Sequence, residues 1–190
     1  GQSLGQEVKM ADLHKFSVQE ATNASLKRVI KVQPTITLDD NGDNHVAFNW
    51  TEIPNAFSGK GVAATLNSIF IINGNDVADV VELVFCRGGD DSGTAPTAAQ
   101  QLGTGSAVVD ITQPETQEVE ICGHVNIVAG DYVEGDLLTA LIGQKTDIGL
   151  IMSPRKNSTS LYVGGIWRSD PADASAYSTG LLDIYFGFEG

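Results

Sequence analysis

Apolar residues recur at every second position in one short segment of this chain after another, and this period of two constrains the fold most. In residues 181–188, LLDIYFGF, the side chains of Leu182, Ile184, Phe186 and Phe188 share one face. Such alternation is typical of β-strands that bury one face, because successive side chains point to opposite sides. The sequence therefore predicts a chain built from half-buried strands.

Further segments with this pattern are expected at 27–32, 35–38, 45–50, 61–74, 79–86, 120–128, 147–152 and 158–168. The faces expected to be apolar are Val46, Phe48 and Trp50; Val62, Ala64, Leu66, Phe70 and Ile72; Val81, Leu83 and Phe85; Ile121, Val125 and Ile127; Leu161, Val163 and Trp167. Segment 79–86 is expected to neighbour the strand before it. Eight or more strands with long connections predict an all-β antiparallel β-sandwich that is jelly-roll-like.

Composition agrees with a folded, turn-rich chain: 42% of residues are hydrophobic, 18% are charged, and 21 are glycines. Residues 1–26 are polar and weakly patterned, which predicts an extended N-terminal arm. Pro34 and a polar stretch at 51–61 set residues 27–60 apart as a β-hairpin-like segment. Residues 61–190 are then the main sandwich body.

The net charge of −13 is unevenly distributed along the chain. Residues 1–31 hold five basic and three acidic residues, whereas the remaining residues hold six basic and 21 acidic ones. Such an acidic body would be repelled by phosphate, so we expect no nucleic-acid partner. No apolar run approaches the roughly 20 residues of a membrane span, and the first residues lack a secretory pattern, so we expect no membrane partner either.

The arm has few apolar residues. Met10, Leu13 and Phe16 fall three apart, and Ser17 with Glu20 has capping-box spacing, so a short helix is one interpretation. A mildly basic arm on an acidic body can lie across an acidic neighbour, and a solvated tail is the alternative.

Catalytic and metal-binding patterns are weak. Asp39, Asn41 and Asp43 have the spacing of a calcium loop, but Asn44 and Trp50 occupy positions where Gly and Glu are needed, which favours a turn. Cys122 and His124 would lie on one side of a strand with Cys86 nearby, yet no third group orients them. We therefore expect no enzyme, no metal and no cofactor, and two free cysteines.

Carbohydrate binding is an alternative, since Tyr162, Trp167 and Tyr177, with Trp50 and Tyr185, could stack on sugar rings. Aromatic residues on sandwich strands are more often part of the core.

Three segments carry a resemblance: IFIINGNDVADVVELVFC (69–86), STSLYVGGIWRSDP (158–171) and YSTGLLDIYFGF (177–188). With Asp147–Leu150, they resemble small β-rich proteins encoded among the head genes of tailed bacteriophages. In those proteins a Leu-Tyr-Val strand runs into Arg-Gly-Thr-Pro, for which Arg168–Pro171 stands here. The resemblance covers about 61–188, while residues 1–60 have no counterpart and the loop at 169–178 is longer.

The resemblance implies a virion structural protein, made in the host cytoplasm, that decorates the capsid exterior as a cement protein. Its expected partners are the major capsid protein and copies of itself, with a trimer as the first expectation. The residues expected to contact the shell or another subunit are Lys9, Met10, Leu13, Phe16, Lys27 and Arg28. A virion carbohydrate- or receptor-binding module, another head–tail component and a hydrolase with an unfamiliar site are the alternatives.

Overall fold

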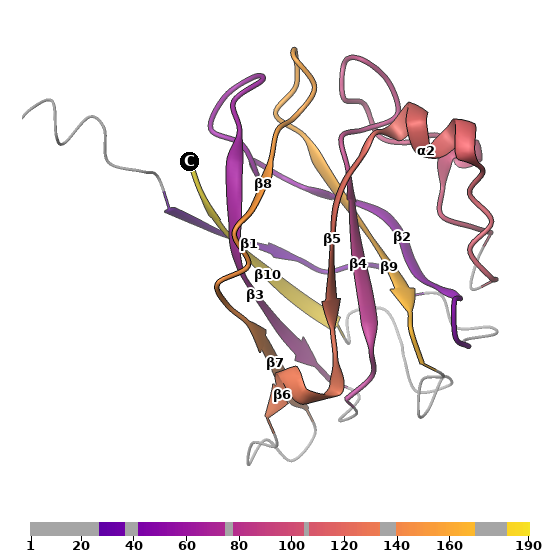
Figure 1. Cartoon of the computed structure of the whole chain (residues 1–190), viewed down its shortest axis with the longest axis vertical. Coiled ribbons are helices and arrows are strands. Elements are labelled where there is room, and N and C mark those ends of the chain that lie inside the picture. The colour runs from indigo at the N-terminus through magenta and orange to yellow at the C-terminus, as the bar shows by residue number, and fades with distance from the viewer. Residues whose placement is uncertain (1–26, 37–41, 75–77, 105–106, 134–139, 170–181) are drawn as a thin grey trace, which may run out of the picture.

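The computed structural model describes residues 27–36, 42–74, 78–104, 107–133, 140–169 and 182–190. Within these residues it contains ten strands, one α-helix and two short 3-10 helices (Figure 1). The strands are β1 (Lys27–Val32), β2 (Val46–Ile53), β3 (Ala64–Asn73), β4 (Val81–Cys86), β5 (Ile121–Ile127), β6 (Tyr132–Val133), β7 (Leu141–Lys145), β8 (Leu150–Met152), β9 (Leu161–Trp167) and β10 (Leu182–Glu189). The helices are η1 (Ala98–Gln100), α2 (Gln113–Val119) and η2 (Ala129–Asp131).

The described strands form two antiparallel sheets. The six-stranded sheet has the order β1-β10-β3-β7-β6, with β8 also pairing with β3, and the four-stranded sheet has the order β2-β9-β4-β5. The pairs β1–β10, β2–β9, β3–β8 and β4–β5 are nested, so the chain is one long hairpin wrapped into two layers. This is the topology of a jelly roll. The predicted antiparallel, jelly-roll-like sandwich is confirmed.

The core lies between the two sheets. Its largest fully buried side chains include Phe48, Phe85, Phe186 and Trp167. The rings of Phe85, on the four-stranded sheet, and Phe186, on the six-stranded sheet, meet edge to face with centroids 5.8 Å apart. Aromatic pairs prefer this geometry, so the contact ties the two layers together.

Strand β10 lies between β1 and β3, in the interior of its sheet. Its alternating residues Leu182, Ile184, Phe186 and Phe188 are each at most 2% exposed. The predicted burial of this segment is confirmed, as are the inward faces predicted for β4 and β9.

The face predicted for residues 61–74 is right only for Ala64 and Leu66, since Val62 precedes the strand and is 45% exposed and the alternation changes beyond Leu66. In the register with β10, Leu66 pairs with Phe188 and Ser68 with Gly187, so Asn67 is an extra residue. A β-bulge of one residue reverses the alternation that follows it. Ile69 and Ile71 therefore enter the core in place of Phe70 and Ile72.

Two irregularities in β2 have the same effect. Phe48 packs in the central core, whereas Val46 and Trp50 belong to a smaller cluster outside the four-stranded sheet, against Leu102 and Ile166. The single face predicted for Val46, Phe48 and Trp50 is therefore wrong. In β5, Val125 and Ile127 are buried as predicted, but Ile121 is 41% exposed beside a further bulge.

Residues 27–60 are part of the sandwich. Because β1 pairs with β10 and β2 with β9, the two strands of this segment lie in different sheets and do not form a hairpin with each other. Likewise β4 pairs with β5 and β9 and does not neighbour β3, which corrects the prediction for residues 79–86. The predicted arm at 1–26 lies outside the described residues.

We predict that Phe186→Ala lowers the free energy of unfolding by about 3–5 kcal/mol, because it removes a fully buried ring. Asp183→Ala is the matched control on the other face of β10. Asp183 forms a surface ion pair with Lys31, at 2.9 Å, and accepts an exposed hydrogen bond from Gln33, at 2.8 Å, so the control should cost about 1 kcal/mol. Denaturant unfolding measures both changes, and equal midpoints would contradict the assignment of the two faces.

Candidate functional site

One end of the sandwich is formed by four connecting segments, at the top of Figure 1. They are residues 54–63 between β2 and β3, residues 87–97 after β4, residues 113–120 including α2, and residues 153–160 between β8 and β9. We call these four segments the braced rim, because two arginine side chains connect three of them and a backbone hydrogen bond joins the fourth.

Helix α2 gives the rim a fixed element. The backbone N–H and the hydroxyl of Thr112 both donate to Glu115, each at 2.7 Å, which lowers the pKa of this carboxyl. Such a contact marks the start of a helix, as Thr and Glu three residues apart predict. The helix ends at Glu120, whose φ of 52° lies in the left-handed region.

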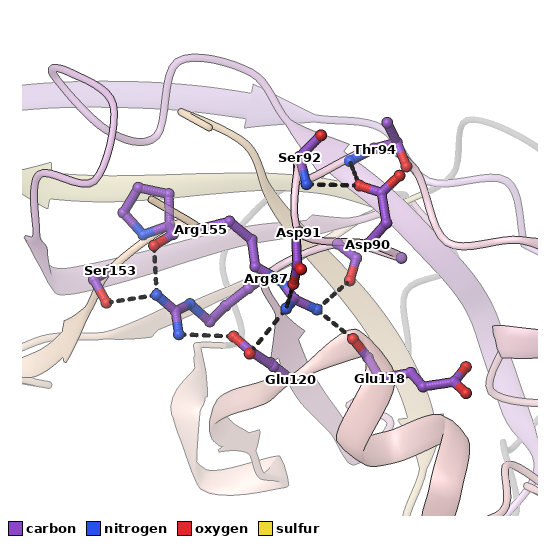
Figure 2. Close-up of polar contacts among 12 residues, drawn as sticks. Arg87, Asp90, Asp91, Ser92, Thr94, Glu118, Glu120, Ser153 and Arg155 are labelled. Carbon is purple, nitrogen blue, oxygen red and sulfur yellow. Dashed lines mark hydrogen bonds and ion pairs between the residues drawn. The ribbon is translucent and has the colours of Figure 1, made fainter. Parts of the chain in front are cut away.

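The Glu120 carboxylate lies between two arginines (Figure 2). One oxygen contacts Arg87 Nη1 at 2.7 Å, and the other contacts Arg155 Nη1 at 2.8 Å. Arg87 also donates to the Ser153 hydroxyl at 3.3 Å and to the Pro154 carbonyl. These contacts connect three of the four rim segments.

Arg155 is the most enclosed residue of this group, with a side chain only 9% exposed. Besides Glu120, its guanidinium contacts Asp91 at 3.1 Å and the carbonyls of Gly88, at 3.3 Å, and Glu118. A buried charge is stable only when paired and hydrogen-bonded, as this one is. Its partners come from two other segments, so Arg155 fixes their relative position.

The loop at 87–97 is also fixed by its own backbone. The Asp90 carboxylate accepts hydrogen bonds from the N–H groups of Ser92, at 2.9 Å, and Thr94, at 3.2 Å, and bonding from Thr94 and Ser92 lowers its pKa. Gly93 has a φ of 71°, and a Cβ there would collide with the Ser158 hydroxyl. A glycine is therefore required where this loop touches residues 153–160.

The chain enters the described structure at this same end. Lys27 pairs with Glu189, and Arg28 Nη2 donates to the Ala56 carbonyl at 2.9 Å, within the rim segment 54–63. A hydrogen bond joins that segment to residues 153–160, because the Gly61 N–H donates to the Ser158 carbonyl at 3.2 Å. Residues 1–26 are thus attached beside the braced rim.

The charge of the rim differs from that of the whole chain. Its four segments hold five acidic residues against four basic ones, a net charge of −1 in a chain of −13. A negatively charged partner would therefore be repelled less at this end than at the rest of the surface.

Among the predicted contact residues, Lys9, Met10, Leu13 and Phe16 lie outside the described residues. Lys27 is exposed, and Arg28 is half-buried by its bond to Ala56. Both line a groove of about 220 Å³ that β1 shares with β3 and β10. The structure therefore brings together the two described members of the predicted set.

Of the aromatic residues considered for carbohydrate binding, Trp50 and Tyr162 pack in one small cluster on the outside of the four-stranded sheet, but Tyr162 and Trp167 are not brought together. Tyr162 is 5% exposed and Trp167 is 1% exposed, and they lie on opposite faces of β9. Tyr177 lies outside the described residues. A separate polar pocket of about 290 Å³ between η1 and α2 is lined by Gln101, Thr104, Asp110 and Glu115, and no aromatic residue is among its described lining.

The cysteines and His124 do not form a nucleophile pair. Cys122 packs against the core, whereas the His124 imidazole is 67% exposed and contacts Glu82 at 3.2 Å, so the two side chains do not share a side as predicted. Cys86 and Cys122 are free, and burial raises the pKa of each thiol to about 12. Reactive thiols need a lowered pKa, so the raised pKa values of Cys86 and Cys122 indicate two unreactive thiols.

In the part of the chain that the structure describes, no three His, Cys, Asp or Glu side chains are grouped as metal ligands. The described helices include none with the length and hydropathy of a membrane span.

The sequence did not single out Arg87, Glu120 or Arg155. A weak signal was present, because Arg87 and Arg155 are two of only six basic residues after Lys31. Both lie in Gly- and Pro-containing segments, where loop backbone needs hydrogen-bonding partners. Their partners are 33 to 67 residues away in the sequence, which no local pattern reveals.

Comparison with known proteins gives no relative: no protein-family model matches the chain, and no curated protein is significantly similar to it.

We predict that Arg155→Met lowers the free energy of unfolding by about 3–5 kcal/mol, because it removes the partner of buried polar groups. It should also speed proteolysis within residues 87–97. Lys156→Met, at the exposed neighbouring residue, should change stability by less than about 0.5 kcal/mol. If Arg155→Met matches this control in both measurements, Arg155 does not brace the rim.

We also predict that iodoacetamide modifies Cys86 and Cys122 slowly in native protein at pH 8 and rapidly in unfolded protein without reductant. Because burial raises the pKa of both thiols from its ordinary value of 9.0 to about 12 on folding, stability should fall as pH rises from about 9 toward 12. Mass spectrometry counts the modified thiols, and a disulfide-linked peptide pair would contradict the prediction.

Proposed function

We propose that this chain is a non-enzymatic structural protein of a bacteriophage virion that decorates and stabilises the capsid. The support is the resemblance of residues 61–188 to phage head proteins, together with one structural observation. The braced rim and the attachment point of residues 1–26 lie at the same end of a rigid sandwich. This end offers the rim and the arm to one partner at once, and the proposed partner is the major capsid protein on the outside of the shell.

The rigidity of the rim matters for such a role. Ordering a loop on binding costs roughly 0.5–1.5 kcal/mol per immobilised side chain, which lowers affinity. In the braced rim, Arg87 and Arg155 have already fixed the loops by hydrogen bonds. Most of the energy of a contact made there would therefore remain available for binding.

The arm supplies the second attachment. Residues 1–26 carry Met10, Leu13 and Phe16, which need another surface to become buried, and two of the chain's basic residues, Lys9 and Lys15. A segment tethered beside a docked rim binds at a high effective concentration. Lys9, Met10, Leu13 and Phe16 would thus contact the shell beside Lys27.

Stabilisation then follows from mass action. A protein that binds the assembled shell and not its separated subunits stabilises the shell by RT ln(1 + [L]/Kd) at each site. At 100 times Kd this is about 2.7 kcal/mol per site, and a shell holds many sites. The acidic body would face solvent, and the cement would act by adhesion without catalysis.

We predict that capsids stripped of the protein release their genome at a lower temperature, and that adding the protein back restores the difference. Removal of residues 1–26 should weaken particle binding while the sandwich still unfolds cooperatively. Co-sedimentation measures binding, and a dye-release melt measures genome release. Identical melts with and without the protein would refute the cement role and favour the receptor-binding module or another head–tail component.

A substitution pair tests the rim itself. Asn157→Trp places a bulky side chain on the exposed rim turn and should weaken particle binding at least about tenfold, or 1.4 kcal/mol. Asn126→Trp makes the same change at an exposed position of β5, away from the rim, and should bind normally. Equal binding by both variants would exclude the rim as the contact.

A further inference from the structure

The outer face of the six-stranded sheet, which points away from the core, has an unusual number of apolar residues. The register places Val133, Ile142 and Ile72 in one row across it, and Phe70 and Tyr185 in the next. Val29 on β1 and Ile151 on β8 complete the set. We call these seven residues and the strand surface between them the outer face.

Several of these residues are largely open to solvent. Val29 is 75% exposed, Ile151 is 71% exposed and Val133 is 63% exposed, and they are the three most exposed large hydrophobic residues described. Single exposed apolar residues are ordinary, but a set spread over one sheet face marks an interaction surface.

The outer face is also electrically neutral. The register assigns to it, among described residues, the charged side chains Lys27, Lys31, Asp183 and Glu189. Lys31 pairs with Asp183 at 2.9 Å, and Glu189 accepts a hydrogen bond from Asn67 at 3.0 Å. In a chain of net charge −13, this face is where a second acidic copy meets little repulsion.

The edge of the sheet is protected, whereas the face is not. Strand β1 has β10 as its one strand partner in the described residues, and its free edge carries exposed Lys27 and Lys31 and ends before Pro34. Charged side chains and proline on an edge strand oppose edge-to-edge pairing. Among the residues that the structure describes, no comparable device covers the outer face, so contact through the face is favoured.

The outer face is not flat. Gly187 has no side chain between Val29 and Ser68, and a groove of about 220 Å³ runs beside it. Val29 stands next to this groove as a projecting apolar side chain. A two-fold axis through the face would place projection against groove in both copies.

The geometry points to a two-fold dimer in which the outer face of one copy packs against the outer face of a second. The six strands of this sheet, at about 3.3 Å per residue and about 4.8 Å between strands, offer roughly 540 Å² per copy, or about 1,100 Å² in total. This area is just above the roughly 1,000 Å² that a specific interface needs. An isologous contact needs one self-complementary patch, whereas the trimer expected from the sequence needs two different ones.

The leading segment of the same chain is a weaker candidate for this face. Its apolar residues at three-residue spacing are Met10, Leu13 and Phe16 only, and the other large ones, Leu4, Val8, Val18 and Leu26, follow no common spacing. The dimer does not depend on the capsid proposal, since the outer face is separate from the braced rim.

Sedimentation equilibrium of the full chain without capsids tests the dimer. The expected mass is twice the 20.0 kDa chain at concentrations up to about 100 µM, where a micromolar Kd gives mostly dimer. Val29→Glu and Ile151→Glu should each raise the dimer Kd at least about tenfold. Val108→Glu is the control, because Val108 is 53% exposed and lies off this face. Circular dichroism checks that every variant is folded.

A wild-type mass of one or three chains would overturn the proposal, as would dimers that persist in both face variants. A monomer whose residues 1–26 become more sensitive to protease in Ile151→Glu would identify the leading segment as the occupant, and would also overturn it. Capsid binding is not measured here, so failure of the dimer leaves the cement role untouched.

Discussion

The rest of the structure depends on the nested pairing of strands from opposite halves of the chain. Strand β1 pairs with β10, β2 with β9 and β3 with β8, and of the nested pairs only the innermost, β4 with β5, joins consecutive strands. Closing each outer pair costs loop entropy that is recovered only when both sheets bury their inner faces. The Phe85–Phe186 contact joins one ring from each sheet, so it is part of the burial that compensates for the loop entropy. Because the pairing sends alternate connections to opposite ends of the sandwich, it also gathers the four segments of the braced rim.

The arginines of the rim show how a small domain fixes its loops. An apolar cluster could fill the same space, and replacing buried ion pairs by apolar residues is often neutral or stabilising. Unlike an apolar cluster, Arg155 makes directional contacts, because each of its hydrogen bonds requires one position of a carbonyl or carboxylate in another segment. The loops therefore hold one shape without any partner. The outer face contrasts with this, since its apolar residues carry little directional information and suit a flat, self-complementary contact.

Sequence periodicity predicted those strands that are regular. In β10, every second residue from Leu182 to Phe188 is buried, as the pattern indicates. The same reasoning failed after Asn67 in β3 and after Val46 in β2, because a bulge adds one residue without a distinct sequence signal. The rim was not predicted for a different reason. Arg155 and Asp91 are 64 positions apart, and their meeting follows from strand pairing, which composition and spacing do not specify.

The central position of β10 has a consequence for synthesis of the protein. Before residues 182–189 emerge from the ribosome, β1 has no strand partner among the described residues, and the six-stranded sheet is split between β1 and β3. The nascent chain then exposes unpaired strand edges and the apolar surfaces that β10 will later cover. Folding of the six-stranded layer therefore waits until residues 182–189 have been made, and a chain interrupted before them remains a target for chaperones and proteases. Only copies that contain these residues acquire the complete sheet.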